Sequence, residues 1–166
     1  RIAAQAEKEG AVLLVAGDKT HPEVQGIVGH TRGEVFVFAD LAELKAWKGP
    51  SDPQKPLFAV AQTTFQVTKW KESSEFLKKA YTNARIFDTI CNATWARQQE
   101  AEDLSQKCDH MVVIGGHHSS NTQKLVQVAA KHTRAVTVET ASELRPEWFA
   151  DVKVAGVTAG ASTPSS

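Results

Sequence analysis

The stretch Ala11-Val12-Leu13-Leu14-Val15-Ala16 is an unbroken apolar run that ends at a glycine, Gly17. A short run without alternation of polar and apolar residues is typical of a strand buried on both faces of a parallel sheet. Comparable runs recur along the chain, at residues 35–39, 57–61, 85–90, 111–114, 135–138 and 152–157. The sequence therefore predicts a series of buried parallel strands.

Segments with the apolar spacing of helices lie between these runs. One stripe comprises Val67, Trp70, Leu77 and Tyr81, a second Ala101, Leu104 and Cys108, and a third Leu125, Val128 and Ala129. Residues 1–10 also have helical spacing, and Gly10 occupies the place of a C′ glycine. Strands that alternate with helices predict an α/β fold with right-handed crossovers.

Capping boxes are expected at three helix starts, where Ser or Thr precedes Glu or Gln by three residues. The pairs are Thr20 with Glu23, Ser120 with Gln123, and Thr140 with Glu143. A long helix ends near Tyr81 and a new strand begins near Ala84, which places a seam between them. We therefore expect two similar small domains, residues 1–82 and 83–166, each a mostly parallel three- to four-stranded sheet flanked by helices.

Composition and charge exclude several classes of protein. The 166 residues are 42% hydrophobic and 23% charged, too apolar for a disordered chain. Nineteen basic residues balance nineteen acidic ones, so no overall field favours nucleic acid or an anionic membrane. No apolar run approaches the roughly 20 residues that span a bilayer, and no signal peptide is visible. Any anion site must therefore be local.

Cys91 and Cys108 are too few for a disulfide framework, which favours a reducing, cytosolic setting. Cys108 continues a helical stripe and is expected to pack. Cys91 lies where a strand meets a helix, so it is either a small core residue or a well-placed thiolate.

Polar loops follow five predicted strands, and ligands bind beyond the carboxyl ends of strands in open α/β sheets. These loops are residues 17–23, 62–64, 88–94, 115–122 and 157–164. His21 and Glu23 either only open a helix or face a ligand, where they could bind an anion and relay protons. Gly115 and Gly116 allow a close turn into a helix start, which is the best local signal for phosphate binding.

The remaining signals in these loops are weaker. His117 and His118 lack the partner spacing of a metal site, so solvated histidines are expected. Neither a GxGxxG pattern nor a GKS or GKT phosphate loop occurs, which argues against a typical dinucleotide or P-loop site. As a set, the loops are rich in hydroxyl and amide groups and suit an anionic ligand such as a phosphate ester.

Taken in order, five motifs in these loops resemble the 4-hydroxy-3-methylbut-2-enyl diphosphate reductase family, also called LytB or IspH. The motifs are His21-Pro22-Glu23-Val24, Ala61-Gln62-Thr63-Thr64, Asp88-Thr89-Ile90-Cys91-Asn92-Ala93-Thr94, Ser119-Ser120-Asn121-Thr122 and Val157-Thr158-Ala159-Gly160-Ala161-Ser162. They span essentially the whole chain. Each motif alone is weak, whereas the ordered set is specific.

The resemblance implies three small α/β domains around a central [4Fe–4S] cluster, with one cysteine ligand from each. It implies reductive removal of the substrate's hydroxyl to give isopentenyl and dimethylallyl diphosphates in the non-mevalonate pathway. Two electrons would come from ferredoxin or flavodoxin, with no nucleic acid or membrane partner. The compartment would be the bacterial cytoplasm or the plastid.

The resemblance also implies roles for individual residues. Cys91 matches the cluster ligand of the third domain, Glu23 the proton-relay acid, and Thr63 the threonine beside the substrate's hydroxyl end. The residues that match contacts to the diphosphate are His21, Ser119, Ser120, Asn121 and Ser162.

Three parts that the resemblance implies have no counterpart in this sequence: the first domain, the cysteine of the second domain and the last helix. We therefore expect residues 1–82 and 83–166 to be the truncated second and third domains of a longer reductase, with two further family cysteines encoded upstream of Arg1. A non-catalytic module that binds a diphosphate or another phospholigand is the alternative. An unrelated α/β domain with coincidental loops is a third.

The single family cysteine, Cys91, leads to a first prediction. This chain alone should bind no stable [4Fe–4S] cluster and have no reductase activity, because two of the three implied cysteine ligands are missing from it. Anaerobic reconstitution followed by iron quantification and a turnover assay checks this. A stoichiometric cluster with turnover would show the expectation to be wrong.

Overall fold

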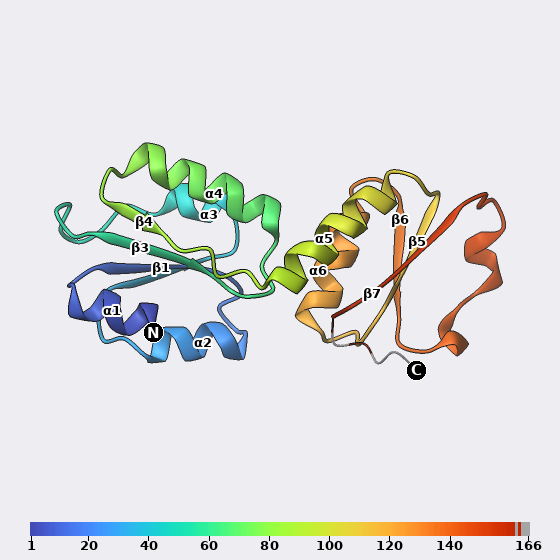
Figure 1. Ribbon diagram of the computed structural model, residues 1–166, viewed down its shortest axis with the longest axis horizontal. Coiled ribbons are helices and arrows are strands. Elements are labelled where there is room, and N and C mark those ends of the chain that lie inside the picture. The colour runs from blue at the N-terminus through green and yellow to red at the C-terminus, as the bar shows by residue number, and fades with distance from the viewer. Residues whose placement is uncertain (162, 164–166) are drawn as a thin grey trace. The chain divides into compact units, whose positions relative to one another are not determined.

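The computed structural model describes residues 1–161 and 163, in which helices and strands alternate as the apolar pattern predicts (Figure 1). The first part contains α1 (Ile2–Lys8), β1 (Val12–Ala16), α2 (Pro22–Gly29), β2 (Val35–Phe38), α3 (Leu41–Ala46), β3 (Leu57–Ala61), α4 (Val67–Ala80) and β4 (Ala84–Ile86). The second part contains α5 (Asn92–Ser105), β5 (His110–Ile114), α6 (Ser120–Ala129), β6 (Arg134–Val138), the 3-10 helices η1 (Ala141–Glu143) and η2 (Pro146–Phe149), and β7 (Ala155–Ala159). The predicted α/β class is confirmed. In the described residues, no helix has the length and apolar content that crossing a membrane requires.

The chain forms two compact units, Arg1–Ile90 and Cys91–Ser166. This differs from the boundary at residues 82 and 83 that the sequence pattern suggested. The reason is β4, which pairs in parallel with β3 and so belongs to the first sheet. The strand expected at residues 85–90 is also shorter, ending at Ile86.

The first unit has a four-stranded sheet in the order β2-β1-β3-β4, and all its strands are parallel. Both central strands, β1 and β3, are buried along their whole length, as predicted. Val12 and Leu14 pack in a cluster with residues of α3 and α4, while Leu13 and Val15 pack with residues of α1 and α2. Figure 1 shows these helix pairs on opposite faces of the sheet.

The second unit has a three-stranded parallel sheet in the order β6-β5-β7. Val113 of β5 packs on one face with α5 and α6. On the other face, Val112 and Ile114 line a cavity of about 240 Å³ together with Leu144 and Phe149. The last strand departs from expectation: it begins at Ala155, not at residue 152, and it is not buried on both faces, since Val157 is 57% exposed.

Helix starts follow the predicted capping boxes only in part. The box at Thr140 and Glu143 is present on η1. The first residue of α2 is capped by His21, because the Thr20 hydroxyl donates to Asp18 Oδ1 instead. The start of α6 is capped by Ser119 and not by Ser120. Gly10 has a positive φ of 62° just after α1, as expected of a C′ glycine.

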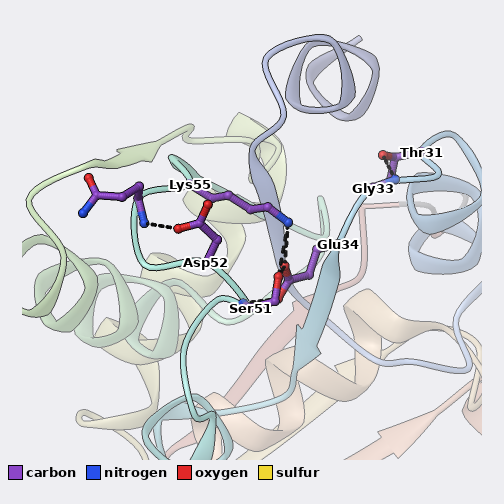
Figure 2. A network of polar contacts seen from close by, with 7 residues as sticks. Thr31, Gly33, Glu34, Ser51, Asp52 and Lys55 are labelled. Carbon is purple, nitrogen blue, oxygen red and sulfur yellow. Dashed lines mark hydrogen bonds and ion pairs between the residues drawn. The ribbon is translucent and has the colours of Figure 1, made fainter.

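A polar cluster fastens the loop between α3 and β3 to the start of β2 (Figure 2). One Glu34 oxygen accepts the Ser51 N–H at 2.9 Å, and the other accepts the Ser51 hydroxyl at 2.6 Å and the Lys55 Nζ at 3.2 Å. The hydrogen bond from the Ser51 hydroxyl is the main reason that the pKa of Glu34 lies below its usual value.

Glu34→Gln should destabilise the first unit by about 1 kcal/mol, because an amide cannot accept all three donors. Since the folded pKa of Glu34 is lowered, its contribution is present above the unfolded pKa of about 4.3 and is lost as the pH falls through the folded value. Urea unfolding at several pH values measures both effects. An acid dependence that is unchanged in the variant would contradict this role.

Two adjacent residues, His110 and Asp109, hold η2 and the segment that follows it against the second sheet. His110 is 3% exposed, its ring nitrogens have no hydrogen-bond partner, and its ring centroid lies 6.4 Å from Trp148 and 5.2 Å from Phe149. Next to it, Asp109 Oδ2 accepts the N–H groups of Lys153 and Val154, each at 3.0 Å. Burial, with a smaller effect of Arg134, lowers the pKa of His110.

This burial predicts acid sensitivity. The unfolded chain takes up a proton at His110 near pH 6.5 whereas the folded chain resists it, so stability should fall as the pH drops below about 6.5. His110→Phe should flatten this part of the pH dependence and should not lower stability at pH 7. Urea unfolding between pH 7.5 and pH 5 measures this, with exposed His118→Gln as the control. Equal pH slopes for both variants would contradict it.

Candidate functional site

A first candidate site, in the first unit, lies at the carboxyl ends of β1 and β3. The Glu23 carboxylate, from the first turn of α2, accepts two hydrogen bonds from Thr63, which follows β3. The Thr63 N–H donates to Oε1 and the Thr63 hydroxyl to Oε2, each at 2.9 Å. The structure thus joins two residues that the sequence predicted separately as site residues. An exposed hydroxyl held on a carboxylate can pass protons to a ligand.

Gln62 connects the loops beneath this pair. It is 1% exposed, its Oε1 accepts the Asp18 N–H at 3.1 Å, and its Nε2 donates to the Thr64 hydroxyl at 3.0 Å. Gly17 is required beside it, since a Cβ there would lie 2.7 Å from Val24 Cγ2 and 3.1 Å from Gln62 Oε1. These contacts fix the relative position of the loops that follow β1 and β3.

His21 is the N-cap residue of α2, and its Nδ1 accepts the Glu23 N–H at 3.2 Å. One ring nitrogen of His21 therefore caps the first turn of α2. Residues 17–23 can thus open a helix and also face a ligand, so the structure is compatible with both interpretations.

A cavity of about 460 Å³ adjoins Glu23 and Thr63. Its lining also includes Thr89, His30 and the apolar side chains of Ile27 and Val60. Thr89 and His30 are residues to which the sequence analysis gave no role. Nothing in their local pattern marks them, because the cavity forms only when α1, α2 and the strand ends come together.

The segment that leads to Cys91 is fixed to β3. The Thr89 hydroxyl accepts the Ala61 N–H at 2.8 Å and donates to the Ala61 carbonyl oxygen at 2.5 Å. Trp70 Nε1 donates to Asp88 Oδ1 at 2.8 Å. Cys91 then follows as the N-cap residue of α5, with an exposed thiol. Its exposure contradicts the alternative of a small core residue.

A second candidate site, in the second unit, is the start of α6, at the carboxyl end of β5. The Ser119 hydroxyl accepts the Thr122 N–H at 3.4 Å, and Ser119 and Ser120 are half-buried. Asn121 is 7% exposed, and neither atom of its amide group has a hydrogen-bond partner. The buried Thr122 hydroxyl also lacks one. Buried polar groups without a protein partner are rare in native proteins, so these groups are candidates for contacts with a ligand or a bound water.

Two glycines make room for Thr122. A Cβ on Gly115 would lie 2.4 Å from Thr122 Oγ1, and one on Gly160, in the loop after β7, would lie 2.8 Å from the same atom. Gly115 also has a φ of 154°, which other residues rarely adopt. The glycines therefore bring the loops after β5 and β7 together around the start of α6.

Other predicted residues have different outcomes. Ser162 and Pro164 lie outside the described residues. His117 is not simply solvated, because its Nε2 lies 2.9 Å from Glu143 Oε2. Cys108 packs as expected: it is half-buried, close to Gly156.

The donor set limits what metal group the described residues can hold. Within the described part of the chain, no group of three or more His, Cys, Asp or Glu side chains could hold a metal ion. Cys91 offers a single exposed thiol. Iron–sulfur clusters bind cysteine thiolates, so these residues fit such a cluster as the source of one ligand in a larger set.

The family model described as LytB protein matches residues 1–166. The chain belongs to the LytB family. Its four- and three-stranded parallel sheets agree with a solved structure, the E-1-hydroxy-2-methyl-but-2-enyl-4-diphosphate reductase from Plasmodium falciparum. That structure has a TM-score of 0.87 and 26% sequence identity, covering 98% of this chain and 51% of the other.

Relatives by sequence agree with this family. A 4-hydroxy-3-methylbut-2-enyl diphosphate reductase from Campylobacter hominis is 39% identical over 165 residues, which are 99% of this chain and 58% of the relative. The same-named protein from Helicobacter pylori is 42% identical over 158 residues, 95% of this chain and 56% of the relative. The chain thus spans somewhat more than half the length of these LytB relatives.

Proposed function

We propose that this chain is part of an iron–sulfur reductase that converts 4-hydroxy-3-methylbut-2-enyl diphosphate to isopentenyl and dimethylallyl diphosphates. Membership of the LytB family and the names of the relatives support this. The two units would be the second and third α/β domains of that enzyme. The expected compartment is the bacterial cytoplasm or the plastid.

The observation that carries the proposal is the amide group of Asn121. It is buried without a partner at the start of α6, where the N–H groups of the first helical turn would also favour an anion. A diphosphate oxygen would satisfy the Asn121 Nδ2, and Ser119 and Ser120 would add hydroxyl donors. Ser162 would complete this set. These donors are neutral, so the binding relies on directed hydrogen bonds more than on charge.

Glu23 and Thr63 would serve the hydroxyl end of the substrate. The reaction consumes two electrons and two protons: the carbon–oxygen bond breaks, the hydroxyl leaves as water with one proton, and the allylic carbon skeleton gains the other proton with the electron pair. Thr63, whose hydroxyl donates to Glu23 Oε2 at 2.9 Å, would position the departing hydroxyl. Glu23 would first take up a proton from solvent and then pass it to that hydroxyl, which leaves as water. His21 would contact the diphosphate.

Cys91 would hold one iron of a [4Fe–4S] cluster, which supplies the electrons when bound. Ferredoxin or flavodoxin would reduce it. The exposed thiol at the N-cap of α5 supports this assignment.

Inorganic pyrophosphate binding by the intact chain tests the diphosphate half. Asn121→Leu should weaken the binding at least about tenfold, because a site that hydrogen-bonds a ligand loses most when a buried donor is removed. The same variant should keep or raise the free energy of unfolding, since it removes a buried amide without partners. Calorimetric titration and urea unfolding measure these two quantities.

Gln127→Leu, at an exposed position near the end of α6, is the matched control. It should leave the affinity unchanged. Failure of the folded wild-type chain to bind pyrophosphate would refute the diphosphate site, and an unchanged affinity in Asn121→Leu would refute the role of Asn121.

A further inference from the structure

His117 holds the turn between β5 and α6 at three points. Its backbone N–H donates to Glu139 Oε1 at 2.7 Å, and its carbonyl oxygen accepts the Gln123 Nε2 at 2.8 Å. Its ring Nε2 lies 2.9 Å from Glu143 Oε2. The main chain and the side chain of one residue therefore connect the turn to the end of β6, to η1 and to α6 itself.

These contacts fix an otherwise flexible segment. Gly115 and Gly116 precede His117, and glycine loses more conformational freedom on ordering than any other residue. Ser119, two residues later, is the N-cap of α6. A site whose donors are neutral and directional depends on their positions, so a turn that is already ordered binds more tightly than one that must be ordered by its ligand.

The partner of His117 is itself held in place. Glu143 Oε1 accepts the N–H groups of Glu139 and Thr140, each at 3.2 Å. Hydrogen bonding to His117 is the largest cause of the lowered pKa of Glu143. Glu143 is therefore a charged, anchored acceptor for the imidazole ring.

The charges of this cluster oppose anion binding if they act alone. Glu139 and Glu143 bring negative charge to the side of the turn, and like charges at short range repel a diphosphate. Their hydrogen bonds to the turn favour the same ligand by ordering its binding groups. The two effects have opposite signs, so a substitution can separate them.

We propose that His117, through its contact with Glu143, is a positioning residue for the diphosphate site at the start of α6. The proposal rests on the diphosphate-binding function proposed above. His117 acts through the turn, without touching the ligand, and its ring converts a glycine-rich loop into an ordered one.

The chain offers a matched pair for the test. His132 Nε2 lies 2.5 Å from Glu102 Oε1, so the same unit has a second histidine–glutamate contact, which joins the turn after α6 to α5. His117→Leu should weaken inorganic pyrophosphate binding about tenfold, the effect of losing the order of roughly one residue. His132→Leu should leave it unchanged. His117→Gln should restore most of the affinity, because its Nε2 can donate to Glu143 as the imidazole does.

The Glu143→Ala variant shows which effect of Glu143 on diphosphate affinity is larger, the repulsion by its charge or the ordering of the turn. Weaker pyrophosphate binding, despite the loss of a negative charge, supports positioning, whereas tighter binding overturns it in favour of simple repulsion. Equal losses in His117→Leu and His132→Leu would also overturn it, since they would show a general destabilisation of the unit. Urea unfolding of each variant confirms that the proteins compared are folded.

Two different outcomes distinguish an error in the positioning role of His117 from an error in the proposed function. A folded wild-type chain that does not bind pyrophosphate would refute the function and this inference together. Wild-type binding with an unchanged affinity in His117→Leu would refute the positioning role alone.

Discussion

The parallel register of the strands is the constraint on which the candidate site of each unit depends. In the first sheet, Ala16 of β1 is level with Phe38 of β2 and Ala61 of β3. In the second, Ile114 is level with Val138 and Ala159 in the same way. Parallel strands in register end at the same edge, so the polar loops that follow them start from a common level. The Glu23 to Thr63 contact, 40 residues apart in the chain, is a direct result.

Burial of the central strands maintains this register. A shift of one residue would move the side chains of β1 from one helical layer to the other, and both layers are filled by apolar clusters. The apolar layers therefore fix the strand ends from which the candidate site residues extend.

Local sequence determines the parts of this structure that the sequence predicted well. The apolar runs of β1 and β3 and the amphipathic stripe of α4 depend on residues close in the chain, and their bounds are near those expected. The loops with candidate site residues could also be located, because strands end where apolar runs end. The structure places Glu23 against Thr63, as a common site for these loops requires.

The parts that were missed depend on distant partners. The pairing of β4 with β3 moves the boundary between the units to Ile90, and no local pattern reveals that pairing. Thr20 matches a capping box, but the Asp18 carboxylate competes for its hydroxyl and leaves His21 as the cap. The contact of His117 with Glu143 joins residues 26 apart. At β4 and at His117 a tertiary contact overrides a short-range preference, whereas at Thr20 a competing local contact, two residues away, does so.

The unpartnered amide of Asn121 has a consequence for the lifetime of the protein. A buried donor without an acceptor lowers the stability of the empty fold, and a molecule that binds only the folded state raises it by mass action. The concentration of such a molecule therefore shifts the equilibrium between the folded and unfolded forms of the second unit. Degradation in cells follows the population of opened chains. Under the proposed diphosphate-binding function, the amount of folded protein in the cell would therefore depend on the concentration of the diphosphate ligand.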